Sequence, residues 1–262
     1  MYGLTLTIRP TGGLTFRRMP SAILHISTYP FLPPTTMSGW LRRLMIMAGS
    51  EMYPNTAVKD PDYLALPPDY YVLGAYASPF HKGRIHTTKR HGPMFQSKHA
   101  VFSRLYRNKK DEGNYEKLQL HTWEYLLVDQ LQGYVLHENK TALEDFQQLF
   151  NYGCKIGKEG FAYLDSISEI KLLHQETVKA QPATLLPGDK IIGKQGTLYP
   201  LYRYQYRPKL QLQPNLSEPH PSAIEGFVPF WAGWADEAIE SEYWTDGEIY
   251  FPDALIKVLY VN

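Results

Sequence analysis

The sequence predicts an α+β protein with a ferredoxin-like core, an inserted basic β-hairpin or loop, and a β-rich C-terminal extension. Three observations support this fold class. Hydrophobic periodicity over residues 1–173 gives the order strand, helix, strands, helix, strand, which is the order of a split βαβ unit. A basic stretch over residues 81–110 interrupts that order, and Pro, Gly and Tyr become frequent after about residue 175. We therefore expect a domain over 1–174 and an extension over 175–262 that packs on it.

The N-terminal segment predicts the first strand and the first helix. Residues 2–10 alternate apolar and polar side chains, with Leu4, Leu6 and Ile8 on one face, as in a half-buried strand. After two glycines, residues 14–18 continue as a second extended piece. Apolar side chains then recur at helical spacing from Trp40 to Ala48, and Gly49 is a natural end for that helix.

The remaining core strands are predicted by shorter apolar runs. Residues 70–80 and 161–173 have strand composition. Residues 123–138 predict either two strands or one strand with a turn near Gln132–Gly133.

A second helix is predicted over residues 141–150. Thr141 and Glu144 have the spacing of a capping box, in which each side chain satisfies a free backbone N–H. Gly153 fits the left-handed position that ends such a helix. The stripe expected to be buried consists of Leu143, Phe146, Leu149 and Phe150.

The extension is predicted to be mainly β. In the tyrosine-rich run 199–208, we expect Tyr202, Tyr204 and Tyr206 to share one strand face and the arginines to share the other. Such faces could stack bases and hold phosphates, but a half-buried strand with tyrosines in the core is the more economical interpretation. The last 38 residues hold eight acids and one lysine, and the final apolar run 254–261 predicts a closing strand.

Charge is distributed unevenly along the chain. Residues 1–110 hold 15 Lys and Arg against four acids, whereas residues 111–262 hold 12 against 22. Between His81 and Lys110 there are nine Lys and Arg, four His and no acid. A surface of that charge density attracts phosphate backbones. The alternative is a solvated loop that keeps the protein soluble.

The composition also excludes several classes of protein. Cys154 is the only cysteine, so no internal disulfide can form, and a reducing, cytoplasmic location is expected. No run reaches the ~18 apolar residues of a membrane span. Zincin and hydrolase motifs are absent, so we expect no metal, no cofactor and no catalytic residue. Histidines in the basic stretch, among them His86 and His91, leave a metal-independent ribonuclease as an alternative.

Two glycine-containing segments are candidate phosphate sites. In the first, Gly39 is expected in the first turn of its helix, where the absence of a side chain exposes backbone donors to a phosphate. The alternative role of Gly39 is close packing of the helix over a strand. The hydroxyl and guanidinium donors of this segment are Thr35, Thr36, Ser38, Arg42 and Arg43.

The second segment lies between the second helix and the strand that follows it. Its glycines and lysines fit neither a Walker loop nor a dinucleotide fingerprint. A loop that lets a single-stranded backbone approach fits better, and a plain helix end with a tight turn is the alternative. The residues concerned are Lys155, Gly157, Lys158 and Gly160.

The order of these segments resembles the RAMP superfamily of CRISPR-associated proteins, whose core is of the RRM/RAMP kind, and more closely Cas family five. The resemblance covers about residues 1–170 and depends mainly on "YPFLPPTTMSGWLRRL" (29–44) and "GCKIGKEGFAYL" (153–164). It implies a non-catalytic subunit of a type I Cascade effector, fitting a less common subtype such as type I-D. Such a subunit caps the 5′ handle of the crRNA and helps to position target DNA near the PAM. The implied partners are the crRNA, the Cascade large subunit and the backbone subunits.

The resemblance and the charge pattern together define the expected RNA-binding residues. The resemblance places the helix-start segment and the glycine loop along the handle, with Arg17 and Arg18 on the same face, and it makes 81–110 the inserted element. A protein-interaction module without RNA contact is the second alternative. The expected RNA-binding residues are Arg17, Arg18, Thr35, Thr36, Ser38, Gly39, Arg42, Arg43, Lys82, Arg84, His86, Lys89, Arg90, His91, Lys98, Arg104, Arg107, Lys155, Gly157, Lys158 and Gly160.

Overall fold

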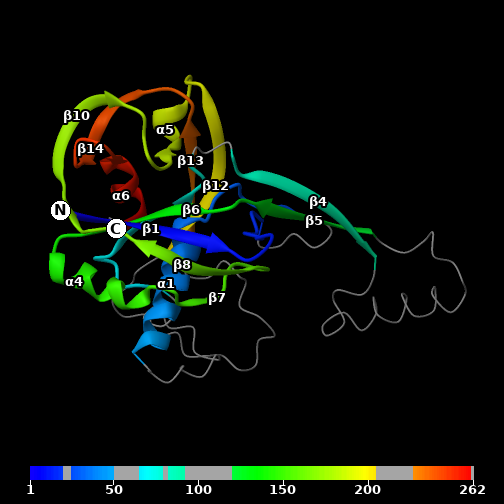
Figure 1. Cartoon of the computed structure of the whole chain (residues 1–262). Coiled ribbons are helices and arrows are strands. Elements are labelled where there is room, and N and C mark those ends of the chain that lie inside the picture. The colour runs from blue at the N-terminus through cyan, green and yellow to red at the C-terminus, as the bar shows by residue number, and fades with distance from the viewer. Residues whose placement is uncertain (20–24, 50–64, 79–81, 92–119, 205–226, 261–262) are drawn as a thin grey trace, which may run out of the picture.

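An antiparallel sheet lies at the centre of the molecule, and five of its strands follow one another side by side (Figure 1). The computed structural model describes residues 1–19, 25–49, 65–78, 82–91, 120–204 and 227–260. The five strands have the order β3-β6-β1-β8-β7, and a short sixth strand pairs with β1. The strands are β1 (Tyr2–Pro10), β3 (Tyr71–Tyr76), β6 (Leu131–His137), β7 (Gly153–Lys155), β8 (Phe161–Ile167) and β9 (Lys171–Leu172).

The strand order confirms the predicted ferredoxin-like core. The first, second, third and fourth core strands along the chain are β1, β3, β6 and β8, and they lie side by side as second, third, first, fourth. The pairings β3–β6, β6–β1 and β1–β8 are antiparallel, and β6 separates β1 from β3. This is the arrangement of a split βαβ unit.

One face of the sheet is covered by the helices α1 (Pro34–Ala48) and α4 (Lys140–Glu144), the latter continuing as the 3₁₀ helix η3 (Asp145–Leu149). The predicted alternation in β1 is confirmed, because Leu4, Leu6 and Ile8 are all buried. The C-terminal strands and α6 lie over the opposite face in Figure 1. Contact of Tyr134 with Phe251 (ring centroids 5.1 Å apart) joins the two layers there.

Details of the second helix differ from the prediction. Asn139, not Thr141, caps it, because its Oδ1 accepts from the Thr141 N–H at 3.0 Å. The left-handed residue after it is Asn151 (φ 63°), whereas Gly153 begins β7. Leu143, Phe146 and Leu149 are buried as expected, but Phe150 is 55% exposed. The helix tightens to 3₁₀ after Glu144, which turns Phe150 away from the stripe.

The inserted element includes a two-stranded hairpin. Strand β4 (Arg84–His91) pairs antiparallel with β5 (Leu120–Leu127), and β5 also pairs parallel with the short β2 (His25–Ile26). The hairpin extends away from the body of the molecule (Figure 1). The run 123–138 therefore contributes two strands, as one alternative predicted, but their turn lies at 128–130 and not near Gln132–Gly133.

The C-terminal extension adds two three-stranded sheets, β10-β14-β15 and β11-β13-β12. Its predicted closing strand is wrong, because the segment is helix α6. Asp253 starts this helix, accepts from the Trp244 indole N–H at 3.0 Å and pairs with Lys257. The elements are β10 (His174–Ala180), β11 (Leu186–Pro187), α5 (Gly188–Ile191), β12 (Gly196–Tyr204), β13 (Phe227–Ala235), β14 (Ile239–Thr245), β15 (Tyr250–Pro252) and α6 (Asp253–Tyr260).

The faces of β12 also differ from the prediction. Tyr199 and Leu201 are buried, and alternation puts Arg203 on their side, where its Nη1 donates to the Val258 carbonyl at 2.9 Å. The face of β12 that carries Arg203 therefore points toward the core. Tyr202 lies on the opposite face and is half-buried. Tyr206 lies outside the described residues.

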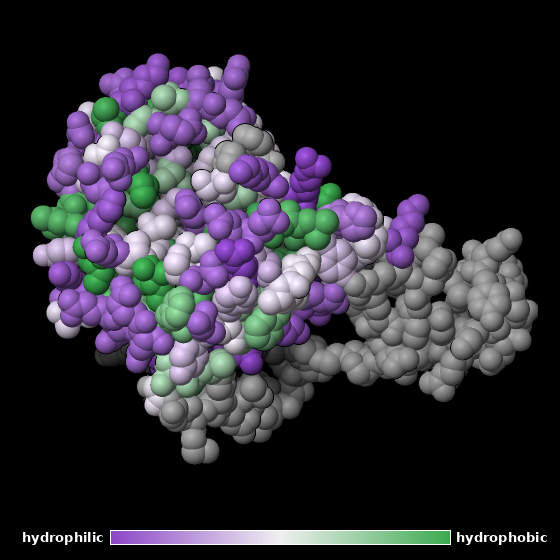
Figure 2. All heavy atoms as spheres, viewed as in Figure 1, coloured by the Kyte–Doolittle hydropathy of each residue, from purple (hydrophilic) through white to green (hydrophobic). Residues whose placement is uncertain are grey.

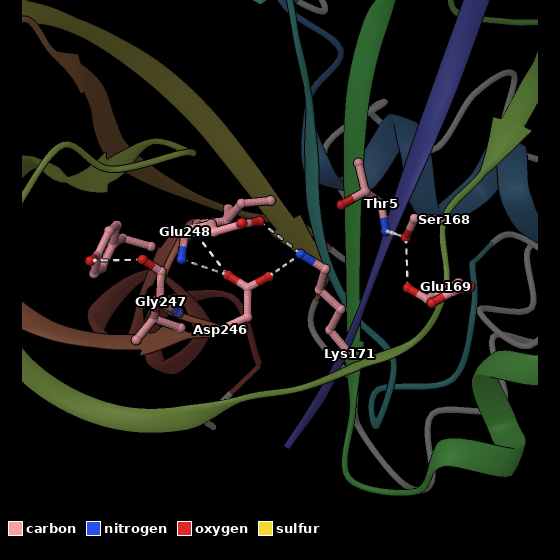
Figure 3. A network of polar contacts seen from close by, with 10 residues as sticks. Thr5, Ser168, Glu169, Lys171, Asp246, Gly247 and Glu248 are labelled. Atoms are coloured by element: carbon pink, nitrogen blue, oxygen red, sulfur yellow. Dashed lines mark hydrogen bonds and ion pairs between the residues drawn. The ribbon is translucent and has the colours of Figure 1, made fainter.

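Polar contacts and a shared core join the extension to the sheet. Lys171 of β9 donates to Asp246 at 2.6 Å and to Glu248 at 3.0 Å, and both acids lie in the β14–β15 turn (Figure 3). Nearby, the Thr5 N–H donates to the Ser168 hydroxyl at 2.9 Å. Buried side chains from both sides of residue 174, such as Leu4 and Leu255, belong to one hydrophobic cluster.

Figure 2 shows hydrophilic side chains over most of the visible face, with smaller apolar patches between them. Among the described helices, none is long and apolar enough to cross a membrane.

Candidate nucleic-acid interface

A glycine loop after β7 packs directly on the extended segment after β1. The Lys158 N–H donates to the Thr15 carbonyl at 2.8 Å, and the Thr15 N–H donates to the Glu159 carbonyl at 2.8 Å. Gly157 has φ +65°, and a Cβ there would lie 2.6 Å from the Thr15 carbonyl oxygen. Gly160 has φ +130°, and a Cβ there would lie 2.5 Å from Leu14. Only glycine combines these backbone conformations with so close an approach.

This packing brings together cations that are far apart in the sequence. We name Arg17, Lys155 and Lys158 the cationic cluster. Burial lowers the pKa of Lys158 below its ordinary value, the charges of Arg17 and Lys155 lower it further, and Glu159 opposes them. Burial also lowers the pKa of Arg17. The fold thus lowers the pKa of Arg17 and of Lys158, and an anion placed beside them would favour their charged forms.

Helix α1 places a further cation near β7, on the helix-covered face of the sheet. Burial raises the pKa of the Cys154 thiol, and the charge of Arg43 opposes that shift. Cys154 and Lys155 are successive residues of β7, so their side chains point to opposite faces, and the exposed Arg43 lies on the helix-covered face with Cys154. Arg42 is half-buried on the same helix.

The basic hairpin is tied to the same loop. The Tyr125 hydroxyl of β5 donates to the Glu159 carboxylate at 2.7 Å. In the β4–β5 register His86 lies opposite Tyr125 and Arg84 opposite Leu127, so both basic side chains share the face of Tyr125. Tyr125 therefore joins the hairpin's basic face to the glycine loop.

The other face of the hairpin carries a separate part of the predicted set. Lys89 lies opposite Thr122, on the face away from His86. Lys82, Arg84, His86 and Lys89 are all exposed. Arg90 and His91 belong to β4, where they pair with His121 and Leu120. Lys98, Arg104 and Arg107 lie outside the described residues.

Arg18 does not share the face of Arg17. Successive side chains of an extended segment point to opposite sides, and the Arg18 guanidinium lies over the rings of Tyr29 (5.9 Å) and Tyr199 (5.5 Å). The Tyr29 hydroxyl donates to the Pro200 carbonyl of β12. Arg18 thus packs between the core and the extension, which corrects the expectation that both arginines face the RNA.

The helix-start site is not built as predicted. Helix α1 begins at Pro34, so Gly39 is its sixth residue and lies beyond the first turn. Ser38 is buried, and its hydroxyl accepts from the Leu66 N–H at 3.0 Å. A Tyr204 hydroxyl from β12 donates to the Thr35 carbonyl at 3.3 Å. The buried Ser38 hydroxyl is therefore committed to structure.

The remaining donors of that segment are separated along the helix. Thr35 and Thr36 are half-buried near the helix start. Arg42 lies eight residues beyond Pro34, which corresponds to roughly 12 Å along the axis. One phosphate cannot bridge both ends, so the two arginines and the threonines of this helix do not form a single phosphate site.

The sequence did not single out Tyr125 or Glu159. Tyr125 stands in an alternating strand pattern, which indicates a face but not the partner that its hydroxyl contacts. Among the described residues, no group of His, Cys, Asp and Glu side chains is arranged to hold a metal ion.

Two solved structures are similar to this chain, whereas its sequence matches no known family. No family model matches the chain, and no curated protein matches it. A chain of the cryo-EM structure of the type III-B Cmr-beta bound to cognate target RNA and AMPPnP is 10% identical, with a TM-score of 0.47 over 92% of this chain and 86% of that one. A CRISPR protein from Archaeoglobus fulgidus is 10% identical, with a TM-score of 0.42 over 95% of this chain and 98% of that one. The strand order of the central sheet is the observation that shows the ferredoxin-like core.

Proposed function

We propose that this chain is a non-catalytic, RNA-binding subunit of a CRISPR effector complex, and that it binds the 5′ handle of the crRNA. The observation that carries the proposal is the cationic cluster, which the docked glycine loop assembles from segments about 140 residues apart. Arg17, Lys155 and Lys158 would form a seat for phosphates, whose binding releases counterions. The sequence resemblance to Cas family five supplies the class of RNA and of complex.

The path of the RNA follows from the neighbouring elements. The handle would pass over Lys155 and Lys158, beside the basic hairpin face of Arg84 and His86. Affinity would come chiefly from phosphate contacts. The extension, with its acids on β14 such as Glu240 and Glu242, would face protein neighbours in the complex, namely the large subunit or a backbone subunit. Placement of target DNA near the PAM belongs to the same proposal.

Incubation with a labelled repeat RNA in EDTA tests the proposal. We expect salt-dependent binding and recovery of the intact RNA. Cleavage that disappears in His86→Ala would instead identify a metal-independent ribonuclease. Absence of any salt-dependent RNA binding, together with no RNA in the purified complex, would identify a protein-interaction module.

A further inference from the structure

The outer face of the central sheet carries aromatic side chains that the proposed phosphate contacts do not use. Phe161 of β8 is 45% exposed, and Tyr163 is half-buried two residues later. Between and beyond them, Ala162 and Leu164 are fully buried beneath the helices. Because strand side chains alternate, Phe161 and Tyr163 share the face away from the helices. We name these two residues the aromatic pair.

The register of three adjacent strands places cations beside the aromatic pair. Lys155 of β7 lies directly opposite Phe161, and Arg9 of β1 lies opposite Tyr163. The hydroxyl of Tyr163 is close enough to Arg9 to contribute to its raised pKa, whose main cause is the hydrogen bond to Asp165. Tyr163 therefore shares one row of the sheet with Arg9, which is paired with Asp165 at 2.8 Å, and Phe161 shares a neighbouring row with Lys155.

A glycine keeps the flank of Tyr163 flat. Gly153 lies opposite Tyr163 on β7, and a Cβ there would approach the Tyr163 Cβ to 2.7 Å. Two ring positions separated by two strand residues are about 6.6 Å apart. The C-terminal layer contacts this face at Tyr134, on the far side of β1 from the aromatic pair.

Lys155 lies opposite Phe161 and also belongs to the cationic cluster, where its charge lowers the pKa of Lys158. An exposed ring beside a phosphate-binding lysine has the chemistry that recognises single-stranded nucleic acid, since every base has a face that stacks. Protein–protein interfaces are depleted of lysine, whereas this face presents Lys155 beside the exposed ring of Phe161. The charges therefore favour RNA as the occupant.

We propose that the aromatic pair is a stacking platform for unpaired bases of the RNA whose phosphates contact the cationic cluster. This inference rests on the proposed function and adds the mode of base contact. The platform reads no particular base, because stacking tolerates all of them.

Two fluorescein-labelled probes separate the platform from the phosphate seat: octauridine and an abasic ribose-phosphate strand of the same length. Fluorescence anisotropy with the full chain compares the wild type with Phe161→Ala, Phe161→Tyr and the control Leu172→Ala, whose side chain is 67% exposed on the same sheet. We expect Phe161→Ala to weaken octauridine binding by about five-fold or more and to leave the abasic strand unaffected. Phe161→Tyr keeps a ring and should retain most of the affinity.

The outcomes distinguish this inference from the proposed function. Suppose that the wild type binds octauridine in a salt-dependent manner and Phe161→Ala binds it equally well. The aromatic pair then does not stack bases, although the cationic cluster still binds phosphates. This result is also expected if Phe161 contacts a partner protein. An equal loss for both probes would also overturn stacking. If the wild type binds neither probe, both the platform and the proposed function fail.

Discussion

Lys158 carries its charge at a cost, since burial and the charges of Arg17 and Lys155 lower its pKa. A phosphate beside the Lys158 ammonium would favour its charged form and raise the pKa of Lys158 again. Binding of RNA and protonation of Lys158 are therefore linked: affinity falls as pH rises through the lowered pKa of the free protein. That pKa lies below the ordinary value of about 10.4.

Substitution of Lys158 by arginine tests this linkage, because arginine stays charged throughout the range. We expect the affinity of the wild type for a 2′-O-methyl oligonucleotide, which resists alkaline cleavage, to fall between neutral pH and about pH 10.4. Lys158→Arg should lose less affinity over the same range. Parallel pH profiles for the two proteins would contradict the linkage.

Gly157 makes the docked loop sterically feasible. Gly157→Ala combines a φ of +65° with a Cβ 2.6 Å from a carbonyl oxygen, so we expect a loss of about 2 kcal/mol or more in the free energy of unfolding. Gly193 is the matched control, with φ +79° and no described atom within 4 Å of its Cβ. Gly193→Ala should cost only about 1 kcal/mol, measured by urea denaturation. Equal costs would show that the loop tolerates the side chain.

At the scale of elements, the hairpin and the glycine loop are joined by one phenol. Tyr125→Phe removes the donor to Glu159 and should lower the free energy of unfolding by about 1–2 kcal/mol, because the partner is charged. Tyr152→Phe is the matched control, because the Tyr152 side chain is 37% exposed. This substitution should change the free energy of unfolding by less than about 0.5 kcal/mol. Thermal or urea unfolding checks both variants, and a neutral Tyr125→Phe would separate the hairpin from the loop.

Helix α6 shows why an element can be assigned to the wrong class from sequence. Residues 254–261 are almost all apolar, so their hydrophobic pattern fits the period of a strand as well as that of a helix. Asp253 decides for a helix by placing a carboxylate in the first turn, bound to the Trp244 indole and to Lys257. At the other end the Tyr260 hydroxyl bonds both backbone groups of Val72. The Asp253–Lys257 pair at i,i+4 spacing is a local helix signal, whereas the contacts of Trp244 and Val72 come from other segments and leave none.

At the scale of the whole molecule, Lys171 and Asp246 join the core sheet to the extension (Figure 3). Burial alone would raise the pKa of Asp246, but Lys171 and the N–H groups of Ile249 and Glu248 outweigh it, so the pKa lies below its ordinary value. A depressed carboxyl pKa stabilises the fold above the unfolded value of about 3.9 and ceases to do so as pH falls through the folded value.

Asp246→Asn keeps an oxygen for the two backbone donors and removes the charge. We expect its Tm to be lower than that of the wild type at neutral pH and the difference to shrink below about pH 3.9. Equal Tm values at neutral pH, or a difference that persists in acid, would contradict a stabilising role for this ion pair.

The sequence predicted the core better than it predicted the site. Leu4, Leu6 and Ile8 revealed β1 because one buried face imposes strict alternation. The cluster of Arg17 with Lys158 left no such pattern, since it depends on where a loop docks about 140 residues away. Arg18 carried the same charge signal as Arg17, yet alternation directs it to Tyr29 and Tyr199. Composition identifies cations, and only the tertiary fold decides which of them share a face.

The salt dependence of RNA affinity tests whether Arg17, Lys155 and Lys158 form the RNA-binding site. Lys155→Glu with Lys158→Glu is compared with Lys190→Glu and Lys194→Glu, the same change of net charge on exposed lysines of the extension. We predict that the first pair abolishes most binding and reduces the slope of log affinity against log salt by about 1.4 or more, while the second leaves the slope unchanged. Equal losses in both double variants would show that the protein attracts RNA by net charge alone and that the cationic cluster is not its binding site.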